Sequence, residues 1–351
     1  MEDKLGKIDH LLFENIIRVK CGHTRSEVRM GPKFGVDVSV IDLPLGMALA
    51  ATSDPLSLIP FLGLEESAWL SVHLMTNDMA TTGFAPMYGQ FVLNLPPTFS
   101  KTDFSTYWNY IHKFCSEIGI AITGGHTGFI EGQNSTIAGG ATFFTIAQQS
   151  QILTSSNANA GDVILVTKQC AISSTSILAM CFPATIKNKL GNETYNKAVE
   201  MFYETSSLKD ALTAVGTTTR YDDVTAMHDV TEGGVLGAIY ELAFASDNGA
   251  VIYNENIPIG NIQQQVCSLF SIDPRYCVGA GSMIVTCKKD KAAVIIERLD
   301  KENIACCIVG EIKEKGYGIK LEKNGKENDL IYMEGDPYWA AFFNAYKEGW
   351  K

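Results

Sequence analysis

The spacing of apolar residues in the first half of the chain predicts three helices. Leu5, Ile8, Leu12 and Ile16 lie three or four residues apart, as on one face of an amphipathic helix. The other helices predicted in this half cover residues 65–83 and 107–119.

Alternation of apolar and polar residues predicts strands between these helices. The valines from Val36 to Val40 alternate with Asp37 and Ser39, which places the polar side chains on the opposite face of a strand. The strands predicted in this half cover residues 35–44, 47–55, 87–96, 119–125 and 138–147.

A polar segment rich in small residues divides the chain. Residues 147–161 lose hydrophobic periodicity and contain mainly Ser, Asn, Ala, Gln and Gly, which indicates a linker. Beyond it, strands are predicted over 162–168, 249–254, 281–287 and 303–312, and helices over 173–182 and after a loop within 228–249. A length of 351 residues also favours more than one core. We therefore predict an α/β (α+β) protein with domains at residues 1–150 and 151–351.

The charge of the chain excludes one class of partner. It has 28 Lys and Arg against 39 Asp and Glu, a net charge of −11, whereas nucleic-acid binding requires clustered positive charge. Nine cysteines without a CxxC pair predict neither a zinc site nor a disulfide framework, which favours a reducing cytoplasm. No signal peptide and no membrane-spanning segment is expected, because no run of 18 apolar residues occurs.

Three aspartates next to apolar sequence suggest a cation site. Asp37, Asp54 and Asp78 fall in three successive predicted elements, and a carboxylate buried alone is costly. Magnesium is the natural counterion where phosphate is also bound. Structural alternatives remain: Asp37 on an exposed edge strand, Asp54 as a turn former before Pro55, and Asp78 in a polar stripe of its helix.

Two glycine pairs suggest places where a ligand approaches the backbone. Gly124 and Gly125 precede His126 after a predicted strand, and glycine is unfavourable inside a strand. His126 taken alone is better explained as a histidine with local hydrogen bonds than as a ligand. Its charge near neutral pH is open, because histidine titrates near 6.5.

The second glycine pair, Gly233 and Gly234, follows "HDVTE" at the start of a predicted helix. Glycine in a first helical turn is unfavourable, whereas free backbone N–H groups there bind anions. A purely structural alternative is a capping box formed by Asp229 and Glu232.

Six motifs together resemble one superfamily. The chain is similar in their order and spacing to the aminoimidazole ribonucleotide (AIR) synthase-like proteins, which include HypE-type hydrogenase maturation proteins, selenophosphate synthases and thiamine-monophosphate kinases. The motifs are "GPKFGVDVSVI", "ATSDP", "TNDMATTGFAP", "TGGHTG", "AGDVILVTK" and "HDVTEGGVLGA". The match extends over nearly the whole chain and most resembles the HypE type.

The resemblance implies both a fold and cofactors. It implies an N-terminal domain whose sheet dimerises into a barrel, a C-terminal α/β domain packed against it, and ATP bound with Mg²⁺ between them. The metal ligands implied are Asp37, Asp54 and Asp78. The nucleotide positions implied are Lys33, Gly35, Asp37, Asn77, Asp78, Gly124, Gly125 and Thr127. The catalytic positions are Asp54, His126 and Asp229, and the substrate positions are Thr231, Glu232, Gly233 and Gly234.

Several residues depart from the HypE pattern. His126 replaces the usual carboxylate, Gly128 and Ala280 stand where HypE-type proteins have lysine and glutamate, and the chain ends in "AYKEGWK" without a cysteine. The resemblance to the superfamily as a whole, rather than to HypE alone, implies a homodimeric enzyme that transfers phosphate from ATP to an oxygen of a small substrate. Two alternatives are a nucleotide-binding accessory protein that contacts a partner during metalloenzyme maturation, and a small-molecule kinase similar to thiamine-monophosphate kinase.

Overall fold

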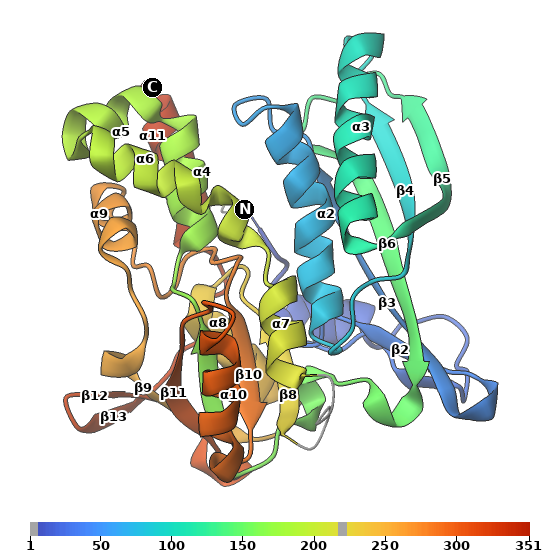
Figure 1. The fold of residues 1–351 in the computed structure, drawn as a ribbon, viewed down its shortest axis with the longest axis vertical. Coiled ribbons are helices and arrows are strands. Elements are labelled where there is room, and N and C mark those ends of the chain that lie inside the picture. Colours follow the sequence, from blue (N-terminus) through green and yellow to red (C-terminus); the bar gives the residue numbers. More distant parts are fainter. Residues whose placement is uncertain (1–5, 217–222) are drawn as a thin grey trace.

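The fold consists of two mixed sheets, each covered by helices (Figure 1). The computed structural model describes residues 6–216 and 223–351, so Leu5 of the predicted N-terminal helix lies outside the described residues. The first sheet has the order β1-β2-β3-β6-β4-β5 and the second β13-β12-β9-β11-β7-β10-β8. None of the helices described is both long and apolar enough to cross a membrane.

The first sheet is antiparallel except where β4 pairs in parallel with β5. Helices α2 and α3 cover one face of it, and α2 also contacts the second half of the chain (Figure 1). Its strands are β1 Val28–Met30, β2 Ser39–Asp42, β3 Met47–Ser57, β4 Tyr88–Leu95, β5 Ala121–Phe129 and β6 Ile137–Gln148. The helices of this half are α1 His10–Leu12, continued by a π-helix at Phe13–Ile17, α2 Leu64–Ala80 and α3 Lys101–Ile118.

The second sheet is antiparallel except where β12 pairs in parallel with β9. Its strands are β7 Val163–Thr167, β8 Val224–Asp229, β9 Gly249–Tyr253, β10 Met283–Cys287, β11 Cys306–Lys313, β12 Ile319–Lys323 and β13 Lys326–Asp329. The helices are α4 Ile172–Cys181, α5 Pro183–Leu190, α6 Asn192–Glu200, α7 Leu208–Val215, α8 Gly234–Ala245, α9 Asn261–Leu269, α10 Ala292–Asp300 and α11 Pro337–Lys347. The central strands β7 and β10 are buried along their whole length.

The prediction that the strand ends at Gly124 and Gly125 is wrong. Strand β5 continues through both glycines to Phe129. Gly125 has φ +146°, and a Cβ there would lie 1.8 Å from the carbonyl oxygen of Phe91 on the paired strand β4. The glycine thus permits close approach of two backbones within the sheet rather than a turn around a ligand.

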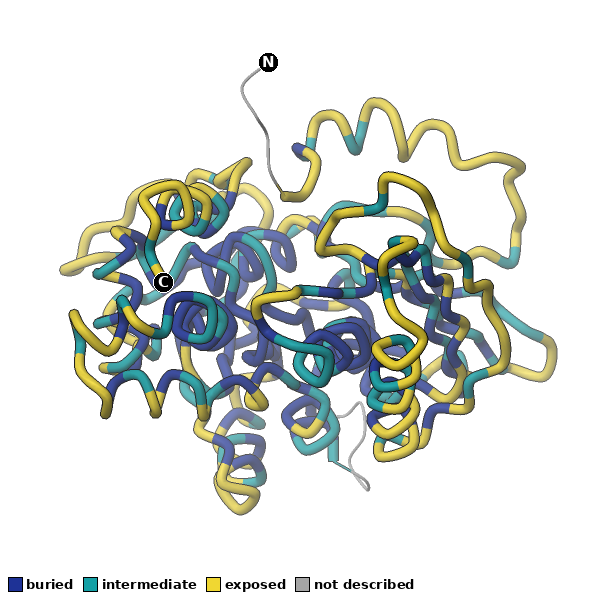
Figure 2. Tube along the Cα trace, turned by 90° about the horizontal axis from the view of Figure 1, so that it is seen from above, coloured by how far each residue is buried: buried dark blue, intermediate teal, exposed yellow. Residues whose placement is uncertain are grey.

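The N-terminal helix is shorter than predicted, and its apolar side faces away from the core. The helical turns begin at His10, whereas Ile8 precedes them. Figure 2 shows the segment as a largely exposed arc beside the body of the molecule. Leu11 and Ile16 are 60% and 52% exposed, so core burial does not explain the apolar period here.

Candidate functional site

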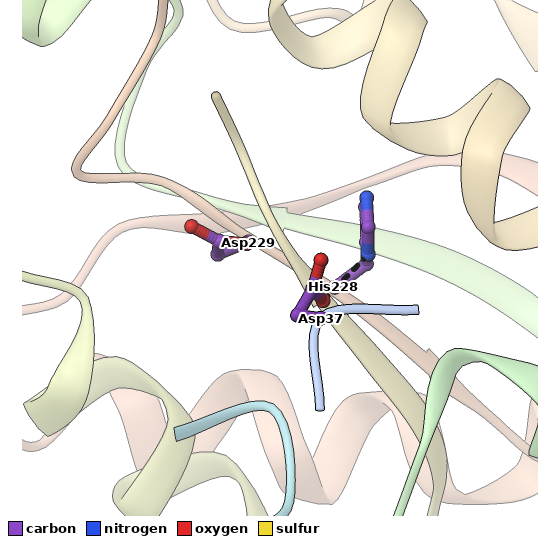
Figure 3. A group of neighbouring side chains, drawn as sticks. All are labelled: Asp37, His228 and Asp229. Atoms are coloured by element: carbon purple, nitrogen blue, oxygen red, sulfur yellow. Dashed lines mark ion pairs between the residues drawn. The ribbon is translucent and has the colours of Figure 1, made fainter. Parts of the chain in front are cut away.

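Acidic side chains from both halves of the chain meet where β8 ends. Asp37 precedes β2, rather than lying within a strand as predicted, and Asp229 is the last residue of β8. His228 precedes Asp229, and one potential ligand atom from each of these three residues lies within 4.8 Å of the other two. Figure 3 shows Asp37 next to strand β8, with the side chains of His228 and Asp229 pointing in different directions.

His228 joins two of these carboxylates, and the sequence analysis did not single it out. Its Nδ1 lies 2.8 Å from Oδ2 of Asp37, and its Nε2 lies 3.2 Å from Oε2 of Glu241 on α8. Burial alone would lower the pKa of His228, but Asp37 and Glu241 outweigh burial and hold it well above its ordinary value. The raised pKa favours the imidazolium form of His228, and its position between the two carboxylates orients Asp37.

The aspartates of β3 and α2 belong to the same electrostatic group. Thr52 of β3 donates its hydroxyl to Oδ2 of Asp78 at 2.9 Å, which joins the two elements. Burial raises the pKa of Asp78 well above its ordinary value, and the charges of Asp229, Asp54 and Asp37 add to this effect. Burial likewise raises the pKa of Asp54 to about 6. Four predicted residues, Asp37, Asp54, Asp78 and Asp229, thus act on one another's charge.

The donor set fits a hard divalent cation. Asp37 and Asp229 bring carboxylate oxygens, the ligands that Mg²⁺ prefers, within 4.8 Å of each other, and the charges of Asp54 and Asp78 act on the same group. Carboxylates grouped in this way are unfavourable without a counterion. Oδ2 of Asp229 is buried and has no hydrogen-bond partner among the residues that the structure describes. A bound cation would satisfy this atom and offset the repulsion within the group.

The raised pKa values predict a decrease of stability with pH in the metal-free protein. Burial and the charge of Asp37 raise the pKa of Asp229 to about 7, and the pKa of Asp54 is about 6, against 3.8 in the unfolded chain. Between these values the folded state binds more protons than the unfolded state. We therefore expect the free energy of unfolding in EDTA to fall as the pH rises from about 4 to about 7.

Urea denaturation at about pH 5 and pH 8, with EDTA or with Mg²⁺, measures this effect. Excess Mg²⁺ should restore stability at the higher pH, because the metal binds the ionised carboxylates. The variant Asp229→Asn, which has one fewer titrating group in the cluster, should lose less stability over the same range. An equal loss in the variant and the wild type would contradict the role of Asp229.

Three predicted nucleotide positions have structural partners. Nζ of Lys33 donates to the carbonyl oxygen of Ala245 at 2.6 Å and to Oγ of Ser156 at 3.1 Å. A Cβ on Gly35 would lie 2.3 Å from the carbonyl oxygen of Glu241, so this glycine permits packing against α8. Nδ2 of Asn77 donates to the carbonyl oxygen of Thr205, and its Oδ1 accepts from the backbone N–H of Ser207. Asn77 thus ties α2 to the second half of the chain.

The structure does not bring the β5 residues to the acidic group. Asp54 on β3 is in register with Ala141 of β6, which pairs with Phe91 of β4 and thereby with Gly125 of β5. Three strand spacings put the backbones of Asp54 and Gly125 about 14 Å apart. The exposed residues Gly124, Gly125, His126 and Thr127 therefore lie outside the cluster within one chain.

The second glycine pair does begin a helix, as predicted. Gly233 and Gly234 have φ values of +82° and +63°, and a Cβ on Gly234 would lie 2.5 Å from the carbonyl oxygen of Arg275. The N–H of Gly233 donates to Oδ2 of Asp336 at 2.8 Å. A carboxylate of the chain itself therefore occupies the anion position expected at this helix start.

The capping-box alternative is wrong, because its two residues have other positions. Asp229 ends β8, and Glu232 accepts from the backbone N–H of Lys7 at 2.7 Å and from Nε1 of Trp339 at 3.1 Å. Thr231 accepts from Nζ of Lys7 at 3.0 Å. Residues near the two ends of the chain therefore contact the predicted substrate positions.

Lys7 is a second residue that the sequence analysis did not select. Its side chain is 51% exposed, and its Nζ lies 3.9 Å from Oε2 of Glu241. Desolvation of the amino group by the residues around it would lower the pKa of Lys7. The negative charges of Glu241, Asp37 and Asp229 outweigh this effect and raise the pKa. Lys7 and His228 together outweigh burial at Glu241 and lower the pKa of that carboxyl to about 2.

Two family models match the chain in tandem. The model described as "AIR synthase related protein, N-terminal domain" matches residues 35–144, and the corresponding C-terminal domain matches residues 159–321. The first match includes Asp37, Asp54 and Asp78, and the second includes Asp229.

Curated relatives extend over most of the chain. A putative hydrogenase expression/formation protein of Methanocaldococcus jannaschii is 25% identical over 274 residues, which covers 76% of this chain and 76% of the relative. A selenide, water dikinase of Methanococcus maripaludis is 27% identical over 311 residues, which covers 83% and 88% of the two chains.

Solved structures share the fold. HypE in a HypE–HypF complex superposes with a TM-score of 0.69 at 18% identity, covering 91% of this chain and 99% of that chain. The hydrogenase maturation protein HypE in complex with ATP superposes with a TM-score of 0.64 at 18% identity, covering 95% and 97%.

Proposed function

Because this chain belongs to the AIR synthase related protein family, we propose that it is an ATP- and Mg²⁺-dependent enzyme that phosphorylates an oxygen of a small substrate. The observation that supports the proposal is the group of four aspartates, two with pKa values raised to about 6 and about 7, at the meeting of the two halves. Carboxylates grouped in this way match the chemistry of a phosphoryl-transfer site, where charge neutralisation provides much of the catalysis.

In this proposal each half of the chain has a role. Asp37, Asp54 and Asp78 of residues 1–150 hold the metal, and Asp229 of residues 151–351 faces them across the site. Bound Mg²⁺ would neutralise phosphate oxygens, and His228 keeps the carboxylate of Asp37 aimed at the ion. The turn at Gly233 would receive the acceptor once the carboxylate of Asp336 releases the backbone N–H of Gly233.

A second candidate function is an accessory role in metalloenzyme maturation. HypE, whose fold this chain shares, has been solved in complex with HypF, and Gly128 and Ala280 stand where the resemblance to HypE-type proteins implies lysine and glutamate. In that case the protein would bind nucleotide but act through a partner protein.

Release of ADP distinguishes the two functions. The protein is incubated with ATP and Mg²⁺, alone and with pooled small metabolites, and the same incubation with EDTA is the control. Metal-dependent ADP release that rises with a metabolite pool supports the enzyme. Nucleotide binding without turnover under every condition supports the accessory role, and failure to bind ATP contradicts both.

We further propose a homodimer in the cytoplasm that forms through the free edge of β5. This strand ends the first sheet, seven of its nine residues are exposed, and Phe129 is 57% exposed. An exposed edge strand can pair with a second copy and extend the sheet. Light scattering should give twice the chain mass of 38.3 kDa, and charged substitution at Phe129 should yield the monomer. A wild-type mass of one chain at micromolar concentration would contradict the dimer.

A further inference from the structure

The N-terminal segment places a lysine against the acidic group. Nζ of Lys7 donates to Oγ1 of Thr231 at 3.0 Å and lies 3.9 Å from Oε2 of Glu241. The backbone N–H of the same residue donates to Oε2 of Glu232 at 2.7 Å. A Cβ on Gly6 would lie 2.5 Å from that oxygen, so the chain passes directly over Glu232.

The ammonium of Lys7 acts on carboxylates from both halves of the chain. It opposes the rise in the pKa of Asp54 and of Asp229, and it lowers the pKa of Glu241. The other cation acting on Asp229 and Glu241 is His228, which is 1% exposed and held between two carboxylates. Of these two cations, Lys7 is therefore the one that can move away from the carboxylates without exposing a buried side chain to solvent.

The segment that bears Lys7 is anchored again at Asp9, which is buried, and at His10, whose ring packs against Phe34 and Phe244, and it is mostly exposed beyond them. Residues 11–12 and 15–25 are exposed, and Figure 2 shows them as an arc beside the body. Few buried apolar contacts mean that local opening of such a segment costs little free energy. Lys7 can thus withdraw while both sheets stay folded.

We propose that Lys7 is the resident cation of the metal-free acidic site and that a divalent metal displaces it, which releases the N-terminal segment. The inference rests on the proposed metal site. The Lys7 ammonium lies 3.9 Å from Glu241 and acts on the charges of Asp37 and Asp229, so a metal ion bound at those aspartates repels it, and the two cations compete. Metal binding is thereby coupled to exposure of Thr231 and Glu232, two predicted substrate positions.

Calorimetric titration with Mn²⁺ at pH 8 tests the displacement. The variant Lys7→Met should bind Mn²⁺ about tenfold more tightly than the wild type, because the metal no longer competes with a tethered cation. Lys7→Arg retains the charge and should bind like the wild type. Lys20→Met is the matched control, since Lys20 is an exposed lysine of the same segment, and it should leave the affinity unchanged.

Hydrogen exchange of the peptide containing residues 6–13 gives a second readout. Here the N–H of Lys7 bonds Glu232, and the N–H of Leu12 bonds Asp9. Mn²⁺ should speed exchange of this peptide in the wild type, and Lys7→Met should exchange fast with or without metal.

The outcomes separate this inference from the proposed function. Equal Mn²⁺ affinity for wild type and Lys7→Met, with unchanged exchange, overturns the role of Lys7 and leaves the metal site standing. Absence of Mn²⁺ binding in every protein overturns both.

Discussion

The substitution Asp78→Asn is expected to weaken Mg²⁺-dependent ATP binding by at least about 100-fold. Asp78 lies in α2 and accepts a hydrogen bond from Thr52, with the charges of Asp229, Asp54 and Asp37 acting on it. Asparagine keeps the size of the side chain but removes the negative charge. An interaction that neutralises a metal ion and triphosphate in a partly buried site is worth several kcal/mol, and each 1.4 kcal/mol is a factor of ten.

The same variant should fold normally. Burial raises the pKa of Asp78 well above its ordinary value and so favours its protonated form, which the asparagine amide resembles in size and charge. Asp290→Asn, at an exposed position of the second half, is the matched control and should bind nucleotide like the wild type. Titration calorimetry with ATP and Mg²⁺ measures both. Binding of Asp78→Asn within threefold of the wild type would remove Asp78 from the metal site.

The substitution His228→Ala is expected to lower the free energy of unfolding by about 3 to 5 kcal/mol. His228 lies between Asp37 and Glu241, at 2.8 Å and 3.2 Å, and is 1% exposed. Removing the imidazole leaves the buried carboxylates of Asp37 and Glu241 without the cation that lies between them, and a loss of this size reflects their desolvation. A cavity the size of the imidazole ring adds to the loss.

Urea denaturation of His228→Ala and His112→Ala tests this expectation. His112 is exposed on α3, and its removal should change stability by less than about 0.5 kcal/mol. A loss at His228 as small as that at His112 would show that the imidazole does not hold the two carboxylates.

Local patterns predicted the elements of the first sheet well. Helix α2 and strands β3, β4 and β6 lie close to the predicted segments, because each has a clear period and a buried apolar face, whereas α3 begins at Lys101, six residues before its predicted start. The fold itself followed from six motifs in register rather than from periodicity. The resemblance to the AIR synthase-like superfamily is confirmed by both family models and by the shared fold of HypE.

The glycines were the least predictable residues. Gly125 lies inside β5 because the backbones of β4 and β5 approach too closely for a Cβ, and sequence alone does not distinguish this cause from a turn around a ligand. Gly234 does begin α8, where the carbonyl oxygen of Arg275 excludes a side chain. Glycine thus permits close approach of two strands at Gly125 and the start of a helix at Gly234. The sequence does not distinguish these two roles, whereas the strand pairing in the structure does.

The partners in the acidic site were missed because they are distant in sequence. Lys7 reaches Glu232 across 225 positions, and Asp336 reaches Gly233 across 103. No periodicity links such residues. His228 did carry a signal, since it adjoins Asp229 in "HDVTEGG", but a strand places neighbouring side chains on opposite faces. Its contact with Asp37 depends on how the two halves of the chain meet.

The central claim is that aspartates from both halves of the chain hold a metal ion on a triphosphate. Anomalous X-ray scattering from crystals grown with Mn²⁺ and a non-hydrolysable ATP analogue tests it most directly. A Mn²⁺ peak is expected at coordination distance from carboxylate oxygens of Asp37, Asp54, Asp78 or Asp229, with the triphosphate alongside. A nucleotide and metal bound elsewhere, with these four carboxylates uncoordinated, would contradict it.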